Sequence, residues 1–480
     1  MDYFHNLDEL LNECVKKYEN LNAFSYYHDS RKIAVTYKDF QKDVFKAALF
    51  LDANYSNENH IALAGQTTYD WVVMFFAIAI SGRTVVLPNI NLKADEFRAE
   101  LESADTSFIF CDDAILPQMT GLRCENINSW TAAKEYTSYS SKIGNSQPMA
   151  IMFTSGTSST PKPVLLSHEN LAANSSCKSL GLTTNDTMLS VLPNYHVFSL
   201  VLNVISPIAN GMCTCLHEDG LDYFSALKKN HITSSVIVPS MLKPLSMMLK
   251  SINCENKRES ADKIFGENLK WVGIGAAYVD PYYVDLFEEY GIHLRAGYGL
   301  TETSSIVSMN NAVLYRPGSV GKLQEICEVK FDSDGEILIR GKNVMLGYYK
   351  MPKETKEAFE DGWLKTGDIG YMDSDGFLYV TGRKKNVIIT SNGENVSPEQ
   401  LESIICKYDG IERAKAYQQD DKICIDVVLA QSVGDSSRLD FLTKIKADFN
   451  ESQPSWRKIF KINAVETICS NTKNISHSLL

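Results

Sequence analysis

A short apolar segment that runs directly into a hydroxyl-rich loop constrains this chain more than any other feature. Residues Ala150 to Phe153 are apolar, and the loop after them ends in Pro161-Lys162-Pro163. An apolar strand that ends in small polar residues suits a loop around an anion, because backbone N–H groups and hydroxyls donate hydrogen bonds and a lysine adds a compact positive charge. The residues that could hold such an anion are Thr154, Ser155, Gly156, Thr157, Ser158, Ser159 and Thr160, together with Lys162.

This loop differs from the Walker A phosphate loop, whose pattern is G-x-x-x-x-G-K-[ST]. Gly156 is followed by Pro161, Lys162 and Pro163, so the second glycine and the hydroxyl residue after the lysine are both missing. Proline has no N–H to donate and hinders a helix that would open at this lysine. A Walker-type NTPase is therefore disfavoured, whereas an ordinary polar surface loop remains an alternative for this segment taken alone.

Strand-like and helix-like segments alternate along the chain. Residues 5–52 predict two helices around a short strand, and residues 60–65 and 84–87 predict strands on either side of a buried helix at 71–80. A second alternation follows residue 150. This order is typical of parallel α/β layers.

From Gly335 the pattern changes to short strands separated by Gly and Asp turns, which predicts a small β-rich subdomain. The last hundred residues predict a further small α+β unit. We therefore expect a large layered N-terminal α/β domain, residues 1–382, and a small mobile α+β C-terminal domain, residues 383–480. The active site is expected in the cleft between them.

Composition limits the kinds of molecule that this protein is expected to bind and the cell compartment in which it is expected to lie. The 480 residues carry a net charge of −12 and no Lys/Arg-rich run, which disfavours nucleic acid. Eleven cysteines without a Cys-x-x-Cys pair indicate a reducing compartment, by default the cytoplasm. The longest apolar run, residues 71–80, is too short to cross a bilayer, so no integral membrane segment is expected.

Four further stretches combine residue types that suit a nucleotide. WVGIGAA (271–277) ends in small residues against which a flat ring can lie, and YGLTET (298–303) offers an aromatic ring, a hydroxyl and a carboxylate suited to Mg²⁺. WLKTGD (363–368) ends in an acid that can accept hydrogen bonds from a ribose, and GRKKN (382–386) is a basic turn between strands. Each stretch alone is weak evidence, because such turns are common.

Together, and in this order, these stretches resemble the adenylate-forming superfamily of acyl-CoA synthetases, peptide-synthetase adenylation domains and firefly-type luciferases. The likeness extends from about Leu7 to Asn395, and phrases such as YGLTETS, RPGSVGK and GRKKNVIITSNGENVSP look most like long-chain fatty acyl-CoA ligases. The resemblance implies that a carboxylate attacks the α-phosphate of ATP, releasing pyrophosphate, and that a thiol then displaces AMP. Both reactants of the first step are anionic, so catalysis must come from positioning and charge neutralisation.

The resemblance also assigns roles at the phosphates and the ribose. The hydroxyl-rich loop with Lys162 matches the contacts to the β- and γ-phosphates, Thr301 matches the α-phosphate contact, and Glu302 matches the Mg²⁺ ligand. Asp368 and Arg383 match the ribose contacts. The implied cofactors are ATP and Mg²⁺, with the thiol of coenzyme A or of a phosphopantetheine arm as co-substrate.

At the adenine and the acid, Gly275, Ala276 and Tyr298 match the adenine pocket, with Tyr298 stacking on the base. His196, in the stretch LPNYHVF, matches a residue near the acyl carboxylate, although a core or helix-capping histidine is the alternative. Lys385 matches the hinge about which the C-terminal domain turns between the half-reactions.

Three departures from the family pattern stand out. Ser159 and Pro163 occupy positions that are usually glycine, and Ala277 occupies a position that is usually proline. The C-terminal Pro-x-Thr-x-x-Gly-Lys motif, whose lysine bridges carboxylate and α-phosphate, is degenerate here. Lys473 is the single candidate in that tail and lies off register. It either substitutes imperfectly or plays no part, and adenylation is then slow or assisted by a partner.

Three classes of function stay open at this point. The first is an active acid–thiol ligase acting on a fatty or related acyl acid. The second is a relative that hands its acyl-AMP to a dedicated partner such as an acyl carrier protein, and the third is a nucleotide- or acyl-binding protein with impaired catalysis. The apolar run 197–208 could line an acyl tunnel or form a packed core helix.

Overall fold

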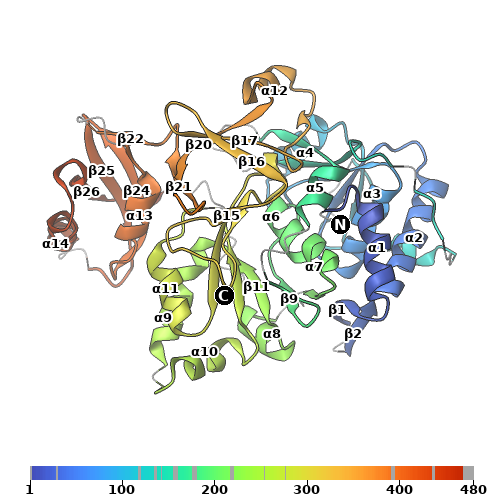
Figure 1. The fold of residues 1–480 in the computed structure, drawn as a ribbon, viewed down its shortest axis with the longest axis horizontal. Helices are drawn as coiled ribbons and strands as arrows, with labels where there is room; N and C mark the ends of the chain where they lie inside the picture. Colours follow the sequence, from blue (N-terminus) through green and yellow to red (C-terminus); the bar gives the residue numbers. More distant parts are fainter. Residues whose placement is uncertain are drawn as a thin grey trace.

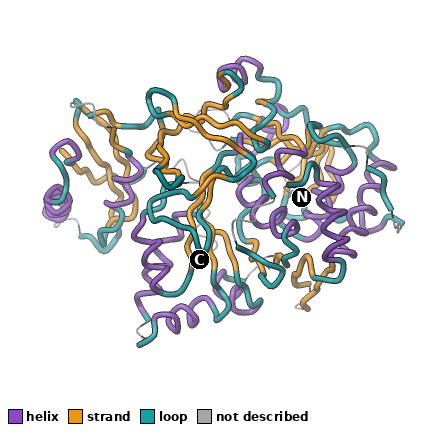
Figure 2. The backbone as a smooth tube through the Cα atoms, viewed as in Figure 1, coloured by secondary structure: helices purple, strands orange, loops and turns teal. Residues whose placement is uncertain are grey.

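The computed structural model describes residues 3–28, 31–116, 121–134, 138–141, 143–154, 161–175, 181–216, 221–252, 254–275, 277–390, 395–434 and 438–468. Two mainly parallel sheets and a third, antiparallel sheet form the bulk of the molecule, and a smaller unit of strands and helices lies at one end (Figures 1 and 2). The predicted α/β class, with a large N-terminal part and a small C-terminal α+β part, is confirmed.

The first sheet carries the hydroxyl-rich loop. Its central strands are parallel, and β8 and β18 extend it with antiparallel pairing beyond β7. In spatial order its seven strands are β18 (Gly347–Tyr348), β8 (Pro163–Ser167), β7 (Pro148–Phe153), β4 (Thr84–Leu87), β3 (His60–Ala64), β5 (Phe108–Cys111) and β6 (Arg123–Asn126).

The second sheet has nine strands and carries the WVGIG and YGLTE stretches at its strand ends. Pairing is parallel from β1 to β13 and antiparallel at both edges. In spatial order the strands are β15 (Lys322–Leu323), β14 (Ser308–Met309), β13 (His293–Tyr298), β12 (Trp271–Ile274), β11 (Ser234–Ile237), β9 (Thr187–Ser190), β10 (Cys213–Leu216), β1 (Asn22–His28) and β2 (Arg31–Thr36).

One large apolar core joins these two sheets and the helices around them. Helix α3 (Tyr69–Ile80) is the predicted buried helix, since every residue in it except Asp70 is buried. Polar side chains fix the helix starts: Thr36 caps α2 and Thr68 caps α3 by accepting backbone N–H groups. No helix in the described ranges is long and apolar enough to cross a membrane.

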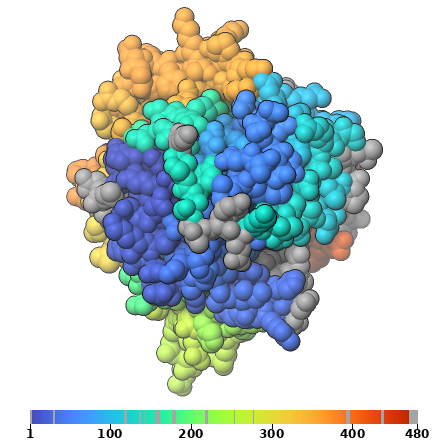
Figure 3. Space-filling view, turned by 90° about the vertical axis from the view of Figure 1, so that its right-hand side faces the viewer, coloured from blue at the N-terminus to red at the C-terminus, as the bar shows by residue number. Residues whose placement is uncertain are grey.

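The other helices of this part flank the sheets. They are α1 (Leu7–Tyr18), α2 (Tyr37–Asn54), α4 (Ala94–Ser103), α5 (His168–Asn174), α6 (Val197–Ser199), α7 (Ser206–Ala209), α8 (Tyr223–Lys229), α9 (Leu242–Ser251), α10 (Lys257–Phe265), α11 (Pro281–Glu289) and α12 (Pro352–Ala358). Blue N-terminal residues dominate the face shown in Figure 3, with orange residues from the region of α12 above them.

Two local features differ from the sequence-based expectation. Between α1 and α2 the chain forms a hairpin of two antiparallel strands, β1 and β2, rather than one short strand. The apolar run from Val197 is helical, but its middle, Leu200–Ile205, is a π-helix. The hydroxyl of Thr214 donates to the carbonyl of Asn203 inside this turn (2.8 Å), which satisfies a backbone group there.

The third sheet is the predicted β-rich subdomain. It pairs β16 (Cys327–Phe331), β17 (Glu336–Gly341), β20 (Trp363–Met372) and β19 (Phe359–Glu360), and β21 (Leu378–Arg383) pairs with β20. All of these pairings are antiparallel, as short Gly and Asp turns dictate. This sheet leads directly into the C-terminal unit (Figure 1).

The C-terminal unit has an apolar core of its own. Its elements are β22 (Ile388–Ile389), β23 (Asn395–Val396), α13 (Pro398–Ile405), β24 (Ile411–Gln419), β25 (Lys422–Leu429), α14 (Arg438–Glu451) and β26 (Ile459–Ala464). Polar contacts dock it on α9 and α11. Lys243 donates to the carbonyls of Cys406 (2.7 Å) and Ile411 (2.8 Å), and Lys407 pairs with Asp280 (2.7 Å).

Candidate active site

The hydroxyl-rich loop is closed at its base by two predicted residues. The backbone N–H of Thr154 donates to the carbonyl of Lys162, and the N–H of Lys162 donates to Thr154 Oγ1, both at 3.1 Å. The β7–β8 pairing extends to Phe153 and Pro163, the residues next to this pair. The backbone of Lys162 is therefore held at the base of the loop, which we call its neck. Ser155, Gly156, Thr157 and Ser158 lie outside the described residues.

Lys162 and Glu302 both contact Tyr348. The ammonium of Lys162 lies 4.7 Å from the centre of the Tyr348 ring, and the Tyr348 hydroxyl donates to Glu302 Oε1 at 2.9 Å. Burial, with the Glu302 carboxylate adding to it, raises the pKa of Tyr348 far above its usual range, so the phenol stays neutral. Thr301 and Glu302 lie on the short 3₁₀ turn Thr301–Thr303.

A second cluster joins Tyr298, Asp368 and Arg383. The Tyr298 hydroxyl donates to Asp368 Oδ2 at 2.7 Å, and Arg383 Nε contacts Asp368 Oδ1 at 2.9 Å. Asp368 and Arg383 face each other across β20 and β21, which explains why residues fifteen positions apart meet. Asp368 is 3% exposed, and burial raises its pKa to about 6 although Arg383 and Tyr298 act in the opposite direction.

Phe198 connects a residue predicted for the adenine pocket, Gly275, with the segment predicted to lie near the substrate acid. Gly275 follows β12, and a Cβ there would lie 3.0 Å from the Phe198 ring, so a larger residue would require that ring to shift. His196 lies two residues before Phe198, half-buried, with its ring 4.4 Å from the Tyr195 ring. The structure thus brings Gly275 and the His196 segment together, while Ala276 lies outside the described residues.

Lys385 is not part of these clusters in the described structure. Lys385 is exposed at the start of the C-terminal unit, and Lys473 lies outside the described residues. Lys384, the residue before Lys385, is held by two carboxylates. Its ammonium contacts Asp334 Oδ2 (2.5 Å) and Glu336 Oε2 (2.8 Å).

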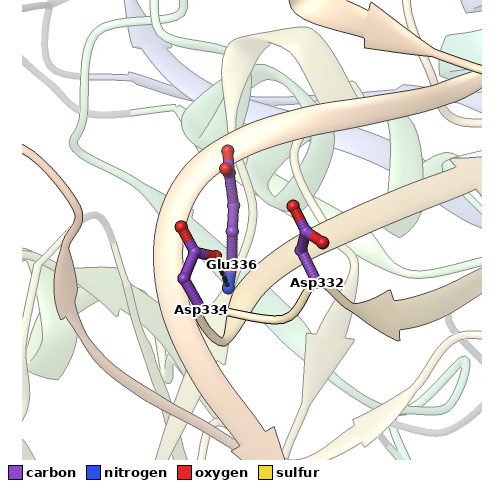
Figure 4. A group of neighbouring side chains, drawn as sticks. All are labelled: Asp332, Asp334 and Glu336. Atoms are coloured by element: carbon purple, nitrogen blue, oxygen red, sulfur yellow. Dashed lines mark hydrogen bonds between the residues drawn. The ribbon is translucent and has the colours of Figure 1, made fainter.

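Those two carboxylates belong to an acidic trio, Asp332, Asp334 and Glu336, at the β16–β17 turn (Figure 4). Carboxylates gathered in this way could hold a cation. Here the Lys384 ammonium already supplies the compensating charge to two of the three, so we assign no metal to the trio. Glu302 is a better candidate for Mg²⁺, because Tyr348 connects it to Lys162 at the base of the hydroxyl-rich loop and Mg²⁺ characteristically takes one or two carboxylates plus phosphate oxygens.

Sequence reasoning missed Tyr348 and Phe198. Tyr348 is 46 residues after Glu302 and reaches Lys162 through strand pairing, so no local spacing could reveal it. Phe198 lies within the LPNYHVF stretch, but its contact partner Gly275 is in another strand of the sheet. The Gly-Tyr-Tyr triplet at 347–349 marks Tyr348 in the sequence, but it does not report the contacts of Tyr348 with Lys162 and Glu302.

Together the fold and the site define an enzyme that handles a nucleotide at the ends of parallel strands. The family profile described as AMP-binding enzyme matches residues 11–349, well over half of the chain. The chain therefore belongs to the AMP-binding enzyme family. This confirms the predicted adenylate-forming superfamily.

The relatives named next show what this chain is similar to. The 2-succinylbenzoate–CoA ligase of Listeria innocua is 30% identical over 394 residues, which cover 80% of this chain and 81% of the relative. The O-succinylbenzoate coenzyme A synthetase of Bacillus subtilis, solved with AMP, is 25% identical with a TM-score of 0.78, covering 96% of this chain and 95% of that chain. Another structure of that enzyme contains ATP and a magnesium ion.

An anthranilate CoA ligase solved with anthranoyl-AMP has a TM-score of 0.83 at 18% identity, covering 98% of this chain and 94% of that one, and so shares the fold. The predicted class of enzyme, an ATP-dependent acid–thiol ligase, is confirmed by these comparisons. The finer likeness to long-chain fatty acyl-CoA ligases is not supported by the relatives named here.

A pH dependence follows from the buried Asp368 carboxyl. Protonation below a pKa of about 6 removes an acceptor that a ribose hydroxyl would use, so affinity for AMP should fall as the pH drops through this value. In Asp368→Asn the affinity should be about tenfold lower at neutral pH, because hydrogen bonds to a charged group are lost. Calorimetric titration with AMP between about pH 5 and pH 8 measures both effects.

The phosphate of AMP titrates in the same range, so the informative quantity is the difference between the wild type and Asp368→Asn. Asp361→Asn serves as a control, since Asp361 is exposed in a turn that precedes the same strand. Superimposable pH profiles for the wild type and Asp368→Asn would contradict a role for this carboxyl in nucleotide binding.

Proposed function

We propose that this protein activates an aromatic carboxylic acid, with 2-succinylbenzoate as the first candidate, and transfers the acyl group to coenzyme A. The observation that carries the activation step is the junction of Lys162, Tyr348 and Glu302 at the neck of the phosphate loop. The choice of an aromatic acid is supported by the Listeria and Bacillus relatives, which are named for 2-succinylbenzoate.

In the first step a carboxylate oxygen forms a bond to the α-phosphorus of ATP, and the bond from that phosphorus to pyrophosphate breaks. Lys162 and the hydroxyl-rich loop hold the β- and γ-phosphates, and Thr301 contacts the α-phosphate. Glu302 would hold Mg²⁺, which would supply charge neutralisation for the triphosphate when bound. No protein nucleophile is required, because positioning and neutralisation lower the barrier between two anions.

The nucleoside is held where β12 and β13 end, beside Asp368 in the middle of β20 and Arg383 at the end of β21. Tyr298 and the small residues Gly275 and Ala276 form the adenine pocket, while Asp368 and Arg383 hold the ribose. The support is that Asp368 is already bonded by Tyr298 and Arg383, which fixes its orientation before a nucleotide arrives. His196, beside Phe198 and Tyr195, lies toward the acid.

In the second step the thiol of coenzyme A attacks the acyl carbonyl, and AMP leaves with the oxygen that came from the acid. We propose a boundary between residues 1–382 and 383–480, with Lys385 at the hinge. The apolar core of the C-terminal unit starts at Ile388, which supports this division. We place the protein in the cytoplasm, supported by nine free cysteines among the described residues.

The acid class is tested by ATP–pyrophosphate exchange with Mg²⁺ and a panel of acids: 2-succinylbenzoate, anthranilate, benzoate, acetate and palmitate. We expect exchange with 2-succinylbenzoate or another aromatic acid, and thioester formation when coenzyme A is added. Exchange with palmitate alone would overturn the aromatic assignment, and exchange with no acid would overturn the enzymatic function. A phosphopantetheinylated carrier protein in place of coenzyme A tests the other acceptor.

Lys473 is tested in the same assay. We propose that it substitutes imperfectly for the family lysine, because it carries the one ammonium group in the final tail, residues 469–480. Lys473→Ala should then lower the exchange rate by about tenfold to a hundredfold, as loss of one charge contact to a reacting phosphate does. Lys461→Ala, which removes an exposed lysine from β26, is the control. An unchanged rate in Lys473→Ala would exclude a catalytic part for this lysine.

A further inference from the structure

Tyr348 occupies a place that no assigned role explains. Its ring faces the Lys162 ammonium at 4.7 Å and its hydroxyl donates to Glu302 at 2.9 Å. We propose that Tyr348 is a positioning residue for acid activation, which keeps Lys162 and Glu302 close together without letting them form an ion pair. This inference rests on the proposed function, since it concerns how the same site receives ATP and Mg²⁺.

A lysine and a glutamate at the mouth of one loop attract each other strongly in a partly buried site. A direct ion pair would consume the positive charge intended for phosphate and the negative charge intended for the metal. No ion pair between Lys162 and Glu302 is present among the described residues, and the Tyr348 side chain lies between them instead.

Tyr348 gives each charge a neutral partner that a ligand can replace or share. The negative face of the aromatic ring attracts the ammonium of Lys162, an interaction weaker than a buried ion pair. The hydroxyl binds a single oxygen of the Glu302 carboxylate and thereby orients that group. A carboxylate has two oxygens, so Glu302 can keep this hydrogen bond while its other oxygen binds Mg²⁺.

The backbone around Tyr348 is fixed to both halves of the site. Tyr348 pairs with Val164 of β8, just after the phosphate loop, and the N–H of Met345 donates to the carbonyl of Glu302 at 2.9 Å. The N–H of Tyr348 donates to Thr355 Oγ1 at 2.9 Å. The segment from Met345 to Tyr348 therefore connects β8, at the base of the hydroxyl-rich loop, to the Thr301–Glu302 turn.

The neighbouring Tyr349 provides a matched control. Its hydroxyl donates to Asp105 at 2.8 Å in an exposed setting, away from Lys162 and Glu302. Tyr349→Phe removes a tyrosine–carboxylate hydrogen bond of nearly the same length as the one between Tyr348 and Glu302. It should leave nucleotide binding unchanged.

The experiment measures ATP affinity by calorimetry with and without Mg²⁺, in the wild type, Tyr348→Phe, Tyr348→Leu and Tyr349→Phe. Tyr348→Phe keeps the ring but loses the hydroxyl, so affinity for ATP with Mg²⁺ should fall about tenfold while affinity in EDTA stays unchanged. Tyr348→Leu also loses the ring face, so affinity should fall under both conditions. Thermal melting checks that each variant folds.

Equal ATP affinity of Tyr348→Phe and the wild type in Mg²⁺ would overturn the inference, and so would an equal loss with and without Mg²⁺. If Tyr348→Leu does not fold, Tyr348→Phe alone decides. Wild-type protein that binds no ATP would overturn the proposed function and this inference with it. Wild-type binding together with an unaffected Tyr348→Phe would overturn the role of Tyr348 alone.

Discussion

The candidate site depends on two opposite charges that contact the same neutral side chain and form no ion pair with each other among the described residues. Activation of an acid by ATP brings two anions together, so the protein must present positive charge to phosphate and carboxylate oxygens to a metal at the same point. We propose that Lys162 and Glu302 are that pair in this chain, and the neutral side chain of Tyr348 contacts both of them. The strand that carries Tyr348 pairs with β8, and Met345 just before that strand donates its N–H to the backbone carbonyl of Glu302, so backbone hydrogen bonds connect the two parts of the candidate site.

Charged side chains also connect the second sheet to the third sheet and to the start of the C-terminal unit. Asp368 is held by Tyr298 of the second sheet and by Arg383 of the last strand before the C-terminal unit. The next residue, Lys384, is anchored to the β16–β17 turn by Asp334 and Glu336. The candidate ribose contact and the connection to the C-terminal unit therefore share one strand, β21, and we propose that this strand links nucleotide binding to the orientation of that unit.

The elements that the sequence predicts well are those with local causes. The buried helix α3, the strand before the hydroxyl-rich loop and the small antiparallel sheet all follow from apolar runs and turn residues. The contacts of Tyr348 with Glu302 and of Phe198 with Gly275 depend on which strands become neighbours, and sequence periodicity does not carry that information. The relatives named above do not support the predicted likeness to long-chain fatty acyl-CoA ligases, because the motifs that suggested it report the nucleotide chemistry shared by the family and not the acid pocket.

The central claim is that the acid is activated as an acyl-adenylate, and transfer of isotope from the acid tests it most directly. The acid is labelled with ¹⁸O in its carboxylate and converted to the thioester with ATP, Mg²⁺ and coenzyme A. The account predicts that AMP is the nucleotide product and carries one ¹⁸O atom in its phosphate, because the attacking oxygen leaves with AMP. Formation of ADP with ¹⁸O in inorganic phosphate, or of AMP without ¹⁸O, would contradict it.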